Sequence, residues 1–309
     1  MIARGRQEKA VFAAALVLML ALAVAVQFVR DRTYASAGGE DRVLYVQSGA
    51  AMQRMALSYD SVLADVYWIR AIQHFGRERL KKTGQRFDLL YPLLDLTTSL
   101  DPRFNTAYRF GAIFLAEPHP SGAGRPDLAI ALLKKGIAAN PTKADFYHDV
   151  GFIYYWNLHD YRSAAEWFNR GAEHPGAPWW LRTYAAVMLT RGGDRQASRA
   201  MWQGLRETAD NEWLRATSEL RLAQLDALDQ IDWLQRASAA YTMKTGAHAR
   251  SWQQLIVAGV VPAVPLDPTG TPFLLEAETG DVGLAPDSPL HPLPTEPVAA
   301  AASQIGQSR

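Results

Sequence analysis

The residues whose types and spacing best suit chemistry are two histidine–aspartate pairs, His148-Asp149 and His159-Asp160. A histidine held by a carboxylate can act as a general base or bind a divalent metal ion. The local periodicity places His148 in a helix and His159 in the turn that follows it. No HExxH motif or compact group of carboxylates lies near either pair in the sequence. We therefore expect hydrogen-bonded or solvated side chains at both pairs, and no metal site.

Other motifs of catalysis are missing from the sequence. It contains no cysteine, which excludes disulfides, thiolate metal sites and cysteine nucleophiles. It also contains no GxSxG, P-loop or GxGxxG pattern. His74 and Glu78 would share one face of a helix, where surface pairing is more common than acid–base catalysis. The sequence therefore predicts a protein that is not an enzyme and that needs no cofactor.

The charge balance argues against a nucleic-acid partner. The formal net charge is +1, so the chain has no strong basic field. The basic run RERLKK at 77–82 is typical of the solvated end of a helix, and its functional alternative is contact with an acidic partner. Hydrophobic residues make up 49% of the chain and charged residues 20%, which is enough to bury a core.

The histidine–aspartate pairs lie in a region where predicted helices follow one another at regular intervals. Helical periodicity runs from Ser48 to about Thr245, with breaks at turn-forming residues. One spacing, 4, 3 and 5 residues, separates Ala129, Leu133, Gly136 and Pro141. It recurs, in full or in part, from Leu90, Ala164 and Ala197. Small residues at the first and third positions allow two helices to approach closely, and proline ends the helix.

The preceding helices carry a companion spacing of 3, 1 and 3 residues. It joins Ala107, Phe110, Gly111 and Phe114, and again Tyr147, Val150, Gly151 and Tyr154. Together the two patterns resemble the tetratricopeptide repeat, with its W-x2-L-G-x2-Y and A-x3-F-x2-A-x4-P signatures. The resemblance covers roughly half the chain, with two good repeats and degenerate ones at 52–102 and 179–210. It implies a solenoid of helical hairpins at 48–210; an unrelated helical bundle is the alternative.

Tetratricopeptide repeats usually bind proteins in a groove lined by the first helix of each pair. The resemblance, carried over by position, places eight side chains there: Asn105, Tyr108, Asp145, His148, Phe152, Tyr155, Trp156 and Arg182. Aromatic and arginine side chains are the usual anchors of protein interfaces. An equally weighted alternative is that Phe152 and Trp156 only pack against the neighbouring repeat. We expect the remaining tryptophans of this region in the core: Trp167, Trp179, Trp180 and Trp202.

A long apolar run stands near the N-terminus. Residues 10–29 contain a single polar residue, Gln27, and are long enough for a helix that spans the hydrocarbon core. Three basic residues precede the run and two follow it, which favours a cytoplasmic N-terminus. The alternative is a signal peptide cleaved after the small-residue motif at 35–37, but the run is long for one. We expect a membrane anchor at 1–30 and a linker at 31–47.

The C-terminal third predicts a small α+β module at 211–287. A helix from Asn211 to Thr245 would end at Gly246. A capping box at Ser251-x-x-Gln254 would start a short helix that closes at Gly259. Turns then flank a hairpin of strands at 272–275 and 282–284. We expect a disordered tail at 288–309, because that segment is rich in proline and alanine and lacks periodicity.

This module resembles the periplasmic part of major pseudopilins of type II secretion systems. The resemblance rests on Tyr241, Gly246, Ser251, Leu255, Gly259, Pro265, Asp267-Pro268, Gly270 and Pro272-Phe273. The chain departs from that family in two respects: it lacks the prepilin peptidase motif and the glycine-rich loop that binds calcium. An equally weighted alternative is a capping element that covers the last repeat helix.

The sequence as a whole predicts a mainly α protein: a repeat solenoid with one transmembrane helix and a small C-terminal module. We expect a scaffold in the bacterial inner membrane, with its soluble domain in the periplasm. It would bind other envelope proteins through its groove and the lipid bilayer through residues 10–29. The pilin-like ending indicates a secretion- or pilus-type machine. A glycan- or small-ligand-binding envelope protein is the alternative.

Overall fold

The computed structural model describes residues 14–26, 29, 52–54 and 56–297. The chain is mainly helical, as the sequence predicts. It divides into two compact units, Met1–Ser48 and Gly49–Arg309. We refer to the second as the helical unit.

In the first unit, residues 14–26 form a helix whose side chains are exposed. The structure does not describe residues 1–13, 27–28 and 30 of the predicted anchor. The whole predicted linker, 31–47, also lies outside the described residues. Over the ranges that the structure describes, we find no helix that combines the length and the apolar character needed to cross a membrane.

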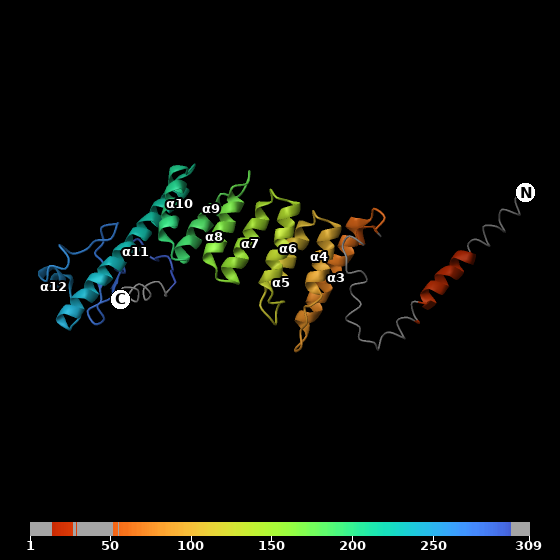
Figure 1. Ribbon diagram of the computed structural model, residues 1–309, viewed down its shortest axis with the longest axis horizontal. Helices are drawn as coiled ribbons and strands as arrows, with labels where there is room; N and C mark the ends of the chain where they lie inside the picture. The colour runs from red at the N-terminus through yellow and green to blue at the C-terminus, as the bar shows by residue number, and fades with distance from the viewer. Residues whose placement is uncertain (1–13, 27–28, 30–51, 55, 298–309) are drawn as a thin grey trace, which may run out of the picture. The chain divides into compact units, whose positions relative to one another are not determined.

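The helical unit begins with a succession of helices that pack on their neighbours in the chain (Figure 1). Their bounds are α3 Asp60–Leu80, α4 Leu90–Leu100, α5 Asn105–Ala116, α6 Pro126–Ala139, α7 Ala144–Trp156, α8 Tyr161–Ala172, α9 Trp180–Arg191 and α10 Arg195–Glu207. Packing is extensive between α3 and α4, between α5 and α6, between α7 and α8, and between α8 and α9. Asp160 and Asp194 start α8 and α10 by accepting hydrogen bonds from the backbone N–H of Ser163 and Ala197.

Glycines on these helices bring neighbouring backbones close together. A Cβ atom at Gly151 would lie 2.7 Å from the ring of Phe168, and one at Gly136 would lie 3.0 Å from the ring of Tyr108. Both distances are shorter than normal carbon–carbon contacts, so a side chain there would displace a core aromatic ring. The expectation that the recurring small residues allow close helix packing is therefore confirmed at these positions, but it is wrong at Gly204, where an added Cβ would meet nothing within 4 Å.

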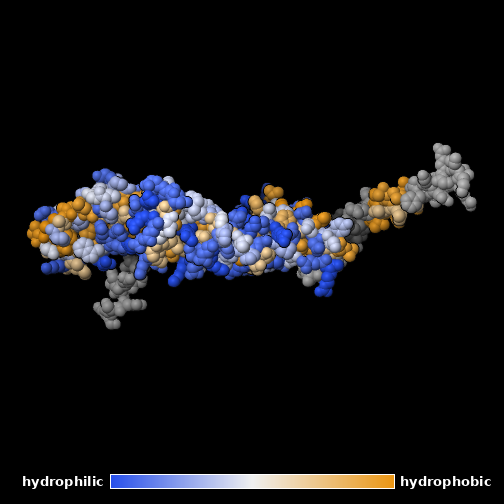
Figure 2. All heavy atoms as spheres, turned by 90° about the horizontal axis from the view of Figure 1, so that it is seen from above, coloured by the Kyte–Doolittle hydropathy of each residue, from blue (hydrophilic) through white to orange (hydrophobic). Residues whose placement is uncertain are grey.

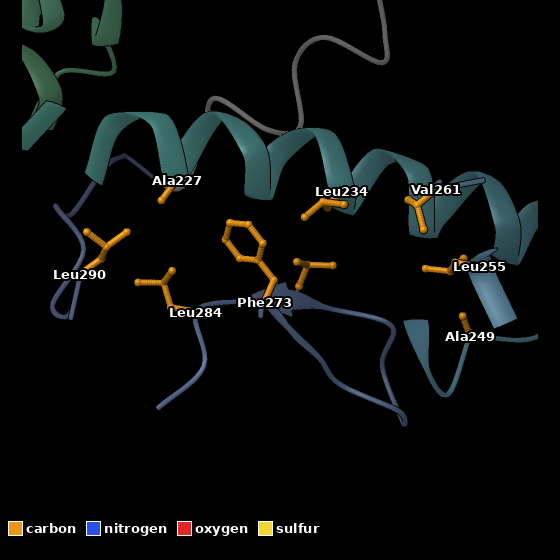
Figure 3. Close-up of a cluster of buried hydrophobic side chains, with 9 residues drawn as sticks. Ala227, Leu234, Ala249, Leu255, Val261, Phe273, Leu284 and Leu290 are labelled. Atoms are coloured by element: carbon orange, nitrogen blue, oxygen red, sulfur yellow. The ribbon is translucent and has the colours of Figure 1, made fainter. Parts of the chain in front are cut away.

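The long helix α11, Glu212–Thr245, supports the C-terminal module. Asn211 starts α11 by accepting the backbone N–H of Leu214 at 2.8 Å, and Gly246 ends it with a left-handed φ of 75°. The module packs on one face of α11, where Phe273 points toward the helix between Leu234 and Leu284 (Figure 3). The long predicted helix is confirmed.

The rest of the module is a short helix and a short hairpin. These are α12, Trp252–Val257, and the antiparallel strands β1, Leu274–Leu275, and β2, Val282–Gly283. The predicted capping box is wrong in detail, because Ser251 makes no side-chain cap. Instead the Gln254 side chain accepts the backbone N–H of Arg250 at 2.9 Å. The module also carries apolar surface, including Val257 and Leu266, and Figure 2 shows hydrophobic residues gathered at this end of the unit.

Asp267 of the Asp-Pro-Thr-Gly turn ties the module together. Its carboxylate is buried and accepts the backbone N–H groups of Thr269 and Thr271 at 2.8 and 3.0 Å, and the hydroxyl of Ser288. Burial alone would raise the pKa of Asp267, but these hydrogen bonds outweigh it and hold the pKa below its usual range. The turn motif therefore has a structural role, which is to fix the start of the C-terminal segment.

The prediction of a disordered tail from 288 onward is wrong for residues 288–297. Leu290 is buried against the module, and the Gln224 amide donates to the carbonyls of Leu290 and Pro292 at 2.9 and 3.0 Å. Glu296 pairs with Arg195 of α10, whose Nε donates to it at 2.6 Å. The segment lacks periodicity of its own, but α11 and α10 supply the surface on which it orders. The remaining residues, 298–309, lie outside the described ranges.

Candidate binding cleft

A cleft lies between α5 and α7, the helices that precede and follow α6 in the chain. Its volume is about 360 Å³. Its lining comes from the facing sides of the two helices and the start of the loop after α5: Arg109, Ala112, Ile113, Ala116, Glu117, Pro118, His148, Asp149, Phe152, Ile153, Trp156 and Asn157. These residues recur every three or four positions on each helix, so one stripe of each helix forms one wall.

The two walls differ in the size of their side chains. On α5, Ala112 and Ala116 are one turn apart and leave space in front of the helix. On α7, Phe152 and Trp156 are 44% and 60% exposed, and their rings lie almost parallel with centroids 6.2 Å apart. The aromatic rings of α7 therefore face two small residues and the exposed Ile113 of α5, across a space open to solvent.

An ion pair joins the two helices at one end of the cleft. Arg109 Nε and Nη2 donate to the two carboxylate oxygens of Asp149 at 2.6 and 3.1 Å. Nη1 of the same guanidinium lies 3.7 Å from Asp145. The hydrogen bonds to Asp149 raise the pKa of Arg109, although burial opposes them. His148 Nδ1 lies 3.0 Å from the same Asp149 carboxylate.

A second polar contact fixes the other end. The Asn157 amide donates to the carbonyl of Ala116 at 2.9 Å, which satisfies one of the free carbonyls at the end of α5. Glu117 pairs with Arg79 of α3 at 3.3 Å. Both ends of the cleft are therefore pinned, and its apolar middle is held open.

The structure places the eight predicted groove residues in different surroundings. His148, Phe152 and Trp156 line the cleft together, and Asp145 is exposed beside it. Tyr155 is half-buried, and its hydroxyl accepts a hydrogen bond from Arg191 of α9 at 2.6 Å. Two more do not line the cleft: Asn105, half-buried at the start of α5, and Arg182, exposed on α9.

The prediction that Tyr108 faces the groove is wrong. Its side chain is fully buried, with its ring against Phe146 and in the space that Gly136 leaves open. Its hydroxyl donates to the carbonyl of Thr98 at 3.4 Å. Burial raises the pKa of Tyr108 to about 12. The residue therefore holds α5 to its neighbours and is not available to a partner.

Sequence reasoning missed Arg109, and it considered Asp149 only as the neighbour of His148, not as the partner of Arg109 at the polar end of the cleft. The positions of Arg109 and Asp149 differ by 40, the same offset that separates Gly111 from Gly151. Opposite charges separated by the same offset as the recurring glycines were therefore a usable signal. Asn157 was also missed, and it carries no comparable signal because its partner is a backbone carbonyl.

The tryptophans expected in the core divide into buried and exposed groups. Trp202 is buried, as predicted, but Trp179 is 55% exposed and contacts Trp213 edge to face. Trp167 and Trp180 are half-buried. Trp180 lies edge to face against His148, with ring centroids 5.2 Å apart.

The two histidine–aspartate pairs do not meet. His148 lies at the cleft, whereas His159 is exposed in the turn after α7, with a φ of 52°. Within the described ranges, no group of three or more potential ligands among His, Asp and Glu is arranged to hold a metal ion.

Comparisons with known proteins leave the geometry as the basis for assigning a function. No family model, curated protein or solved structure matches the chain.

Proposed function

We propose that this protein is a membrane-tethered scaffold of the bacterial envelope that binds a segment of a partner protein in the cleft between α5 and α7. The observation that carries the proposal is the cleft itself, in which the exposed aromatic rings of α7 face apolar side chains of α5. Aromatic side chains at the mouth of an apolar cleft are typical of the energetic centre of a protein interface. The proposal includes no catalytic step.

The succession of paired helices supports a reading of this region as a tetratricopeptide-like solenoid. Gly136 and Gly171 hold equivalent positions in the recurring spacing, and a Cβ atom there would lie 3.0 and 2.9 Å from Tyr108 and Tyr147 of the preceding helix, as the repeat would require. In such a solenoid, α5 and α7 would be the first helices of adjacent repeats and would line the binding groove. The C-terminal module would cap the array, and its exposed apolar end would suit contact with a secretion- or pilus-type machine.

The apolar run at 10–29 supports a tether in the inner membrane, with one pass and the helical unit in the periplasm. A reporter enzyme active only in the periplasm, fused after Arg309, tests this orientation. Activity of the fusion would support the proposal, and activity of a cytoplasm-specific reporter at the same position would contradict it.

Affinity purification from detergent-solubilised membranes tests the scaffold function. The native chain should recover one or more envelope proteins in stoichiometric amounts, and Trp156→Ala should lose them. Trp179→Ala is the matched control, because Trp179 is similarly exposed, at 55% against 60%, but lies outside the cleft. Equal recovery by both variants would place the partner site elsewhere.

A second candidate function is glycan binding. The almost parallel, exposed rings of Phe152 and Trp156 would suit stacking against sugar rings. Retention of the native chain on peptidoglycan, lost in Trp156→Ala and without any protein partner, would favour this function over the scaffold.

A further inference from the structure

The geometry points to a specific class of occupant for the cleft: a partner segment that combines a bulky apolar side chain with a lysine or arginine about 10 Å away. This inference rests on the proposed function and names the chemistry of the partner. It follows from the shape of the cleft's middle and from the charges at its ends.

The middle of the cleft would take the apolar side chain. Ala112, Ile113 and Ala116 line one side and Phe152 and Trp156 the other, so the space between them has almost no polar groups to satisfy. A leucine, methionine or phenylalanine would bury its surface against both walls. A charged or amide side chain would lose its hydration there without gaining a hydrogen bond.

The positively charged group that lines the cleft is already paired with carboxylates of the protein. Arg109 is the one lysine or arginine among the lining residues in the described part of the chain. Its Nε and Nη2 are bound to Asp149, and its Nη1 faces Asp145. A carboxylate from a partner would compete with these two aspartates for the guanidinium and would be repelled by their charges. The cleft therefore disfavours an acidic segment or a free C-terminal carboxylate.

The end of the cleft at Arg109 has one more carboxylate than guanidinium groups. Two carboxylates, Asp145 and Asp149, share the single guanidinium of Arg109. Asp145 is the more weakly bound of the two, with a side chain 57% exposed. At the opposite end, Glu117 is balanced by Arg79. A cation on the partner would therefore be attracted to Asp145 and not to the other end.

The distance between the apolar and the cationic side chain of the partner follows from two positions on α7. Asp145 precedes Phe152 by seven residues, which is about 10 Å along the helix axis. A helical partner would span that distance with about two turns, which also corresponds to seven residues.

Fluorescence anisotropy with three designed helical peptides tests the inference, using the full chain in detergent micelles. The first peptide has a central leucine in an alanine-rich helix and a lysine seven residues away on each side, because the direction of binding is open. The second replaces both lysines with glutamate, and the third replaces the leucine with alanine. All three carry the same fluorescein label.

The lysine–leucine peptide should bind about fivefold or more tightly than the glutamate peptide at low salt, and the difference should shrink as salt is added. The alanine peptide should bind about tenfold more weakly than the lysine–leucine peptide. Asp145→Lys should reverse the preference between lysine and glutamate. Because Asp145 is exposed, this variant should keep the helical circular dichroism spectrum of the native chain.

The other outcomes separate the inference from the proposed function. Peptide binding that needs Trp156 but is equal for lysine and glutamate, or is unchanged in Asp145→Lys, would overturn the inference and leave the scaffold function standing. Binding that is the same in the native chain and in Trp156→Ala would overturn both.

Discussion

Replacing Gly151 with alanine should destabilise the helical unit, whereas the same replacement at Gly76 should stabilise it. Both glycines lie inside α-helices, α7 and α3, where alanine is intrinsically favoured by about 1 kcal/mol. They differ in their surroundings. A Cβ at Gly76 would meet nothing within 4 Å, but one at Gly151 would meet two ring carbons of Phe168 at 2.7 Å and a backbone oxygen of Ala164 at 3.2 Å.

The expected change in unfolding free energy is the gain in helix propensity minus the cost of overpacking the core. Phe168 is 2% exposed, so its ring cannot move without disturbing the core. Overpacking of this kind costs about 1–3 kcal/mol, which exceeds the gain in helix propensity. We therefore expect Gly151→Ala to lose about 1 kcal/mol of unfolding free energy and Gly76→Ala to gain about 0.5–1 kcal/mol.

Thermal unfolding followed by circular dichroism at 222 nm measures both changes. A difference of 1 kcal/mol shifts the Tm of a domain of this size by about 2–4 °C, so the two variants should move in opposite directions from the native chain. Gly151→Ala with a Tm equal to or above that of Gly76→Ala would refute the close approach of α7 and α8.

Three further outcomes are expected. Glu296→Gln should weaken the hold of the C-terminal segment by about 1 kcal/mol, because Arg195 keeps its contacts with Asp229 and Asp232, and limited proteolysis should then cleave near 296 faster than in the native chain. Asp267→Asn should cost about 1–3 kcal/mol at neutral pH, since it replaces a carboxylate that accepts several hydrogen bonds, and chemical unfolding at pH 7 measures it. The folded-state pKa of Asp267 lies below the usual value of 3.8, so its stabilisation is complete above that pH and is lost as the pH falls through the lowered pKa. Unfolding curves between pH 6 and 2 should therefore show a smaller acid-induced loss in Asp267→Asn than in the native chain.

Local patterns predicted the helices and their spacing well. The glycine positions carry their information within a few residues, because a missing side chain acts directly on the helix that packs there. Gly136 and Gly151 therefore indicated close helix contacts correctly. The caps at Asn211 and Gly246 likewise depend on neighbouring residues, and they set the ends of α11 where the sequence predicts them.

Features that depend on distant partners were predicted less well. Tyr108 precedes Gly111 by three residues, as His148 precedes Gly151, but the ring of Tyr108 is buried because it packs in the space beside Gly136. The Arg109–Asp149 pair joins residues of two helices, and neither residue alone indicates it. Leu290 is buried only because the module built on α11 provides an apolar surface for a segment that looks unstructured by itself.

Site-specific photo-crosslinking in intact membranes tests the central claim most directly. The photoreactive residue p-benzoylphenylalanine replaces Trp156 in one version of the full chain and Trp179 in another, two tryptophans of similar exposure. If the cleft holds a partner protein, irradiation should give a discrete protein adduct at position 156 and no such adduct at position 179. Identical adduct patterns at the two positions, or adducts at 179 alone, would contradict the claim that the cleft between α5 and α7 is the partner-binding site.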